Sequence, residues 1–195
     1  RILTPESVAY DPFKDLTPLG LATRFPLLVL VRPDAPYKSF NEMVEFSKKN
    51  PGKIRVGTVG AGSGGHFTLE MINSLTGAGL TMVPFKGASP GVTAILGGHV
   101  EGGVLALGTL VAHVKSGGMK GILTSSKIPE YPEIPTLPEL GYRQNLFGVW
   151  LAFFAPAGVP AEVTKALAPA IEKAVREPAV ASKLAGLGMV QDYVP

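Results

Sequence analysis

Lys53–Ile72 reads KIRVGTVGAGSGGHFTLEMI, and this stretch decides the fold class. An apolar run comes first, four glycines in six positions follow, and apolar residues at helical spacing come last. This order predicts a short strand, a glycine-rich turn and a helix. Within the turn, Gly60, Gly62 and Gly65 match the spacing G-x-G-x-x-G. This spacing occurs in loops that bind dinucleotides, so it raises the question whether the turn binds such a cofactor or another anion.

A glycine-rich turn that enters a helix can bind an anion through its backbone. It presents unpaired N–H groups at the positive end of the helix dipole, and glycine lets the anion approach closely. Phosphate and carboxylate both suit this geometry. Ser63 adds a hydroxyl donor, which favours an oxyanion, and His66 stands at the start of the predicted helix. The simpler alternative is that Gly60–Gly65 only permit a tight turn, with His66 as a surface or capping residue.

The spacing of the glycines alone does not establish a nucleotide site. A dinucleotide fold needs an acidic residue about 20 positions further on, at the end of the next strand. Here that strand ends in MVPFKG, which carries Lys86 and no carboxylate. Ala61 stands two residues before Ser63, where the elbow G-x-S-x-G of acyl hydrolases has glycine. Two alternatives stay open: an α/β enzyme that uses the loop for a nucleotide cofactor or acyl transfer, and the effector-sensing domain of a transcription regulator.

Composition narrows the remaining function classes. The 195 residues carry a formal net charge of +3, with a pI of about 9.1. No Lys/Arg cluster interleaved with aromatics stands out, so nucleic acid is not an expected partner. Cysteine is absent, and His99 and His113 do not stand at ligand spacing, so we expect no metal. No apolar run approaches the ~18 residues of a membrane helix, so we do not expect a membrane-embedded chain.

Strands and helices alternate through the middle of the chain, which predicts an α/β fold with a mainly parallel sheet wrapped by helices. Ser39 and Glu42 have capping-box spacing and begin one helix. Ser89 and Pro90 suggest the N-cap and first residue of another. Pro169 interrupts a helical stripe near the end. Strands are expected in the apolar runs 25–31, 53–59, 80–85, 100–108, 119–126 and 146–154.

Two long apolar strands, at 25–31 and 146–154, flank the alternating part. They are expected to be crossovers that connect a complete central lobe to a second, incomplete lobe. The predicted domains are residues 1–32 (remnant of the first lobe and first crossover), 33–145 (the α/β ligand-binding lobe) and 146–195 (second crossover and first-lobe helices). Hinges are expected near Val31 and Val149, where few residues would absorb a rotation.

A series of motifs across nearly the whole chain resembles a known family. GAGSGGH is followed by VPFKG, then AILGGHV, EGGVLAL and GILTSS, and the chain continues with YPEIPTLPELGY and FGVWLAFFAPAGVP. Near the start stands YDPFKDLTPLG. This order closely resembles the substrate-binding proteins of tripartite tricarboxylate transporters, the Bug family. The resemblance implies a two-lobed periplasmic binding protein of type II that closes on a small carboxylate. It also implies no catalysis, no cofactor, and delivery of the substrate to the membrane permease subunits.

The resemblance also assigns the expected ligand-binding residues. The loop matches the element that holds the ligand carboxylate through N–H groups and a hydroxyl, with His66 beside it. A second cleft-facing turn follows the next strand, and the strand end at Leu105–Thr109 matches a wall of the pocket. The predicted site comprises Gly60, Ala61, Gly62, Ser63, Gly64, Gly65, His66, Lys86, Gly87, Ala88 and Leu107.

Three departures from the family pattern modify these expectations. The first-lobe loop P-F-x-x-G-G-x-x-D is absent, so the chain is expected to be a fragment of a larger periplasmic receptor, with no signal peptide in this sequence. LALGT at Leu105–Thr109 lacks the acid or amide that the family often has there, which makes an amino-acid ligand less favourable. Ala61 replaces a common asparagine, which leaves the amides and Ser63 as the expected donors.

Overall fold

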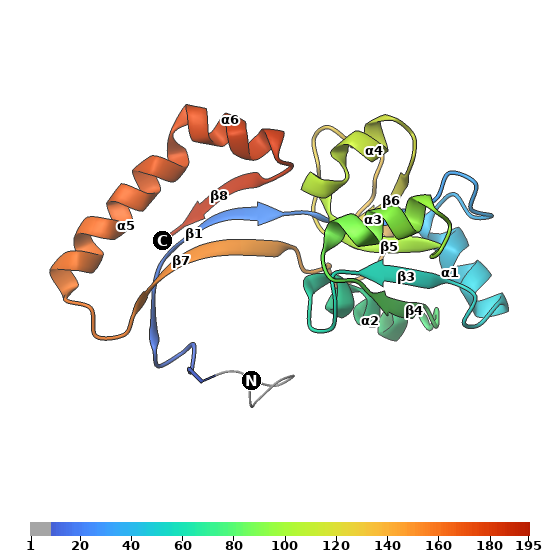
Figure 1. Cartoon of the computed structure of the whole chain (residues 1–195), viewed down its shortest axis with the longest axis horizontal. Coiled ribbons are helices and arrows are strands. Elements are labelled where there is room, and N and C mark those ends of the chain that lie inside the picture. Colours follow the sequence, from blue (N-terminus) through green and yellow to red (C-terminus); the bar gives the residue numbers. More distant parts are fainter. Residues whose placement is uncertain (1–8) are drawn as a thin grey trace. The chain divides into compact units, whose positions relative to one another are not determined.

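The computed structural model describes residues 9–195 and divides the chain into two compact units (Figure 1). The larger unit is the continuous segment Phe25–Val149. The smaller unit combines the N-terminal part, up to Arg24, with Trp150–Pro195. None of the described helices is long and apolar enough to cross a membrane.

The larger unit is built on a five-stranded sheet with the order β4-β3-β5-β2-β6. β3 pairs in parallel with β4 and β5, whereas β2 pairs antiparallel with both β5 and β6. Four strands therefore run in one direction, and β2, which lies between β5 and β6, opposes them. The bounds are β2 Leu27–Val31, β3 Arg55–Thr58, β4 Thr81–Pro84, β5 Gly102–Ala106 and β6 Lys120–Thr124.

Two apolar clusters cover the two faces of this sheet. β2 reads LLVLV and is buried along its whole length because its side chains alternate between them. Leu27, Val29 and Val31 belong to the cluster that contains side chains of α1 and α2. Leu28 and Leu30 belong to the cluster that contains side chains of α3. The helices are α1 Phe40–Lys49, α2 Gly64–Thr76, α3 Ala88–Leu96 and α4 Val111–Lys115, with short 3-10 turns η2 Leu107–Thr109 and η3 Pro138–Leu140.

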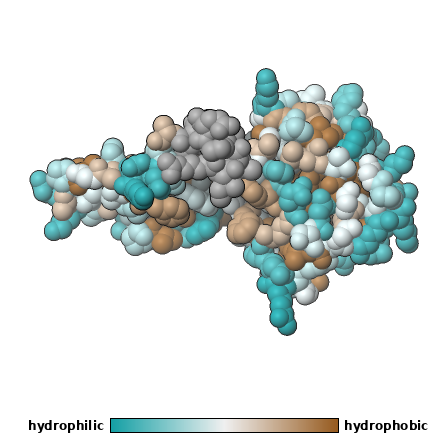
Figure 2. Space-filling view, turned by 90° about the horizontal axis from the view of Figure 1, so that it is seen from below, coloured by the Kyte–Doolittle hydropathy of each residue, from teal (hydrophilic) through white to brown (hydrophobic). Residues whose placement is uncertain are grey.

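The smaller unit is a three-stranded sheet with two helices. Its strand order is β7-β1-β8, and β1 and β8 pair antiparallel. Several large apolar side chains of this unit are exposed, among them Trp150, Phe153 and Phe154 of β7. Figure 2 shows apolar residues among polar ones on one face of the molecule. The bounds are β1 Leu16–Phe25, β7 Val149–Pro156, β8 Val190–Val194, α5 Ala161–Arg176 and α6 Pro178–Gly186.

Several local predictions differ from the structure. The parallel run is interrupted, because the strand predicted at 25–31 enters the sheet between β5 and β6 instead of lying outside the unit. The third helix begins at Ala88, so Gly87 and not Ser89 is its N-cap, and Pro90 is its third residue. α5 continues through Pro169 without a break in its assignment. β1 was not predicted, since its partner β8 lies about 170 residues further along the chain.

Candidate functional site

Three connections leave the sheet of the larger unit at the same edge. β3, β4 and β5 are parallel, so the chain that follows each of them emerges at their common carboxyl edge. These connections contain the glycine loop after Thr58, the turn at Phe85–Gly87 and the turn η2. The Phe85 N–H donates to the Thr58 carbonyl at 2.8 Å, which ties the first two together. Ligand sites of open α/β sheets lie at this edge.

The glycine loop is organised by hydrogen bonds within itself. The Ser63 hydroxyl donates to the Gly60 carbonyl at 2.7 Å and accepts the His66 N–H at 3.2 Å. Ser63 is therefore the N-cap of α2. The Gly62 N–H donates to Nδ1 of His66 at 3.0 Å. The only proton of the Ser63 hydroxyl is used inside the loop, so in this geometry Ser63 acts as a helix cap and not as the ligand donor that the sequence suggested.

Other amides of the same loop have no internal acceptor. Ser63 caps the third helical position, and within the described chain no hydrogen bond is recorded for the N–H groups of Ala61, Gly64 or Gly65. Gly64 and Gly65 are the first two residues of α2, where backbone donors have no partner in their own helix. Two unpaired donors and the positive end of a 13-residue helix are thus in place for a negatively charged group.

The glycines are required by backbone conformation and by packing. Gly60 and Gly62 have φ angles of +118° and +77°, which side chains rarely permit. A Cβ atom on Gly65 would lie 2.6 Å from the Val104 carbonyl oxygen of β5. Gly65 is therefore needed so that the start of α2 can lie directly against the sheet.

A second helix begins at this edge. Gly87 has a φ angle of +111° and is the N-cap of α3, without a side-chain cap. Ala88 opens that helix, so its N–H group is also a first-turn donor. Lys86 is exposed, and the structure of residues 9–195 records no ion pair or hydrogen bond for its ammonium group. Lys86, Gly87 and Ala88 thus lie at the same edge as the glycine loop.

Leu107 differs from the other predicted site residues. Its side chain is 4% exposed and belongs to the apolar cluster on the α3 face of the sheet. Its N–H donates to the Pro26 carbonyl at 3.0 Å, which joins η2 to the segment before β2. Gly108 and Thr109, the next two residues, are exposed. Leu107 therefore lies in the core and supports η2 from inside, whereas Gly108 and Thr109 present the surface.

Sequence reasoning did not single out Ser125, which follows β6. It is 3% exposed. Its N–H donates to the Leu27 carbonyl at 2.9 Å, and its hydroxyl oxygen accepts the Leu27 N–H at 3.0 Å. Ser125 thus fixes the start of β2 at the edge where the glycine loop stands. The sequence shows only two serines, Ser125 and Ser126, at the end of a predicted strand. That pattern does not reveal that Ser125 bonds to Leu27, almost 100 residues earlier in the chain.

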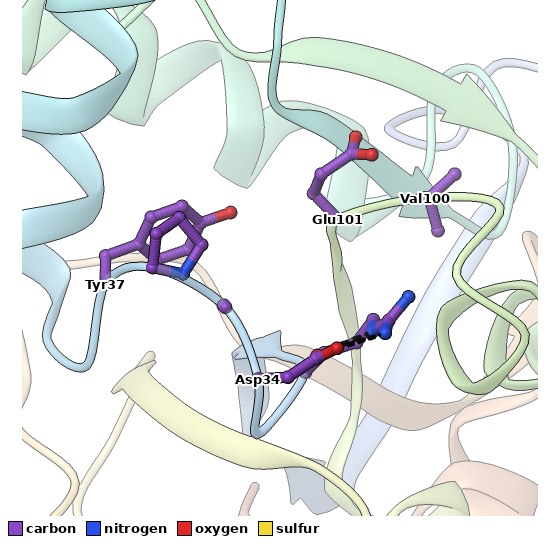
Figure 3. Close-up of a pocket in the computed structure, with 7 residues that line it drawn as sticks. Asp34, Tyr37, Val100 and Glu101 are labelled. Atoms are coloured by element: carbon purple, nitrogen blue, oxygen red, sulfur yellow. Dashed lines mark hydrogen bonds and ion pairs between the residues drawn. The ribbon is translucent and has the colours of Figure 1, made fainter.

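A separate pocket of about 200 Å³ lies at the opposite edge of the sheet (Figure 3). Arg32 and Asp34 form an ion pair there, and Glu101 is held by Arg55, with 2.6 Å between Nη2 and Oε1. Both carboxyl groups have pKa values below their usual range, chiefly because these arginines donate to them. Tyr37 also lines the pocket. The charges are paired with one another, so this pocket offers no free charge to a ligand.

The surroundings of the glycine loop contain little negative charge. Glu70 Oε1 lies 3.9 Å from His66 Nε2, one helical turn along α2. Among the described residues, no group of three metal-ligating side chains comes together. The edge thus combines unpaired N–H donors with few acidic neighbours, an arrangement that suits an anion.

Solved structures of similar fold identify the class of protein. One solved structure, described as a periplasmic transporter, has a TM-score of 0.85 at 29% identity, over 96% of this chain and 63% of its own. MatC from Rhodopseudomonas palustris, solved with bound malate, has a TM-score of 0.81 at 29% identity, over 94% of this chain and 63% of its own. The fold is that of periplasmic solute-binding proteins.

The family model of the tripartite tricarboxylate transporter family receptor, TctC, matches residues 3–194. The chain belongs to this family. Protein BugT from Bordetella pertussis is 29% identical over 93% of this chain and 56% of its own length. The chain therefore spans about half the length of the curated relatives it matches.

Proposed function

We propose that this chain is the ligand-binding part of an extracytoplasmic receptor that captures a small carboxylate and delivers it to the permease subunits of a tripartite tricarboxylate-type transporter. The observation that carries the proposal is the pair of unpaired amides, Gly64 and Gly65, at the start of α2. A carboxylate has two oxygens that can accept both donors. Bonds of this charge-assisted kind contribute about 1.5–3 kcal/mol each.

Charge at the same edge supports an anionic ligand. Lys86 follows β4 and has no recorded partner, so it would attract a carboxylate without first breaking an ion pair. The N-terminus of α3 at Gly87 adds a second positive dipole end at this edge. Family membership favours a receptor in the periplasm, and malate in the related MatC favours a small dicarboxylate over a nucleotide.

Closure of two lobes on the ligand is part of the proposed mechanism. The chain passes between its two units at Arg24–Phe25 and at Val149–Trp150. Val31, where a hinge was expected from the sequence, is 1% exposed, and β2 pairs there with Gly102 of β5 and Lys120 of β6. We therefore place the first hinge at Arg24–Phe25 and keep the second at Val149, because the chain passes from one unit to the other at these two points.

The decisive experiment removes one N–H donor and keeps the helix. Proline is favoured at the first helical position, and Ser63, with φ −74° and ψ 161°, already has the extended conformation that a following proline requires. Gly64→Pro therefore deletes the Gly64 donor. Gly64→Ala is the matched control, since it adds a Cβ atom but keeps the N–H.

Binding of L-malate and related dicarboxylates to the full-length receptor is measured by calorimetry and thermal shift. Gly64→Pro is expected to weaken binding by at least about tenfold, the loss that one charge-assisted bond implies, while Gly64→Ala stays much closer to the parent protein. Equal affinity in both variants would exclude the Gly64 amide from the site. A parent protein that binds none of the carboxylates would refute the proposed function itself.

A further inference from the structure

His66 connects the glycine loop to its helix. Its Nδ1 accepts the Gly62 N–H at 3.0 Å, four residues back along the chain. A ring nitrogen that accepts a hydrogen bond carries no proton, so the imidazole in this structure is the neutral form with its proton on Nε2. The ring is held in this position by stacking against Phe67, with 5.8 Å between ring centroids and an interplanar angle of 24°.

This bond decides which amides of the loop face a ligand. Gly62 has a φ angle of +77°, a conformation that glycine adopts readily and other residues rarely do. By accepting the Gly62 N–H, His66 directs it into the loop, and the unpaired donors that remain are those of Ala61, Gly64 and Gly65. The His66 backbone N–H is also used, because it donates to the Ser63 hydroxyl at 3.2 Å.

We propose that His66 is a positioning residue whose neutral imidazole locks the glycine loop in its binding form, so that protonation of His66 unlocks the loop and weakens capture of a carboxylate. The proposal rests on the proposed function and adds a pH control to the same site. When Nδ1 gains a proton it becomes a donor, and it then faces the Gly62 N–H, which is also a donor. Two donors cannot bond, and the cation also opposes the positive end of α2.

Few charged groups lie around the imidazole of His66. Glu70, on the same helix, is the titratable group within ion-pair reach, at 3.9 Å from Nε2. α2 packs against β3 and β5, and the charged residue of these two strands, Arg55 at the start of β3, is paired with Glu101 at the opposite edge of the sheet. Lys86 lies in the turn that is bonded to the end of β3 beside the loop. The loop Gly60–Ser63 itself is uncharged. A histidine titrates between about pH 5 and 8, a range in which few other side chains change their charge.

The test has a first readout that needs no ligand. The amide resonance of Gly62 is followed by NMR between about pH 5.5 and 8. The expected result is that the Gly62 amide shifts with the same midpoint as the His66 ring and exchanges faster below that midpoint. A Gly62 amide that does not follow the ring would overturn the proposal, whether or not the protein binds a carboxylate.

The second readout is the affinity of the full-length receptor for L-malate across the same range, with three variants. His66→Asn keeps an acceptor near the position of Nδ1 but cannot be protonated, so it should retain affinity and lose this pH dependence. His66→Leu removes the acceptor and should weaken binding about two- to tenfold at every pH. His99→Asn is the matched control, because His99 precedes β5 and so lies at the edge of the sheet opposite to the loop, and it should behave like the parent protein.

The outcomes separate the two proposals. If the Gly62 amide titrates with His66 but the protein binds none of the carboxylates, the positioning role of His66 would be supported and the proposed function would be refuted. Tighter malate binding at low pH, or an unchanged pH dependence in His66→Asn, would show that His66 contacts the ligand directly or plays no part, and would overturn the positioning role.

Discussion

At the scale of single residues, the buried hydroxyl of Tyr37 is a polar group without a recorded partner among the described residues. Tyr37 is 2% exposed. Burial, with a smaller contribution from Glu101, raises the pKa of Tyr37 to about 12. The hydroxyl therefore stays protonated at neutral pH and lies buried without a bond to offset its lost hydration.

Tyr37→Phe removes this unpaired hydroxyl and keeps the ring that packs against Phe46. The expected result at neutral pH is unchanged stability or a gain of up to about 1 kcal/mol. Above about pH 10 the unfolded tyrosine ionises before the folded one, so the parent protein should lose stability faster than the variant as pH rises toward 12. Urea unfolding at neutral and alkaline pH measures both effects. A loss of more than about 1 kcal/mol in Tyr37→Phe at neutral pH would reveal a hydrogen bond that the structure lacks.

At the same scale, the residue types of the site were predictable but their roles were not. The G-x-G-x-x-G spacing identified the loop, because the positive φ angles of Gly60 and Gly62 in this strand-to-helix turn favour glycine. Whether Ser63 donates to a ligand or to Gly60 depends on one hydroxyl rotation that no sequence pattern encodes. The bond between Gly62 and His66 was equally hidden, since it depends on the fold of the loop.

At the scale of elements, close approach of α2 to β5 depends on Gly65. A Cβ atom there would lie 2.6 Å from the Val104 carbonyl oxygen, and the backbone cannot easily yield. Gly65→Ala should therefore destabilise the larger unit by about 1–3 kcal/mol, despite the better helix propensity of alanine.

Gly91→Ala is the matched control, because Gly91 also lies in a helix of the larger unit and a Cβ atom there would make only ordinary contacts at 3.7 Å. Its stability should be unchanged or higher by up to about 1 kcal/mol. Urea unfolding followed by circular dichroism compares the pair. Equal effects of the two substitutions would mean that α2 can move away from β5 at little cost.

The elements that could be predicted are those whose signal is local. Ser39 caps α1 through Glu42, as the capping-box spacing indicated, and the strand, loop and helix of the opening stretch were confirmed. β1 and β8 were missed because their stability comes from pairing between distant segments. The place of β2 in the sheet was missed for the same reason: LLVLV predicts a strand buried on both faces but not its neighbours.

At the scale of the whole molecule, the larger unit contains a complete sheet. Both of its apolar clusters consist of residues between Leu27 and Leu146. We expect the isolated segment Phe25–Val149 to fold without the rest of the chain and to give the same amide spectrum as it does in the complete chain. The measurement is NMR of the segment beside NMR of the 195-residue chain. A poorly dispersed spectrum of the segment would show that the smaller unit is needed for folding.

The path of β2 has a further consequence for protein engineering. Because this strand opposes its neighbours, the chain enters the larger unit at the same edge at which it leaves. A Cβ atom on Gly148 would lie 3.1 Å from the Phe25 carbonyl oxygen, so the two ends of the segment are adjacent. Adjacent ends are what circular permutation and insertion into a host loop require. The segment could be grafted whole into a loop of a reporter protein, because its two ends would rejoin the host chain at neighbouring points.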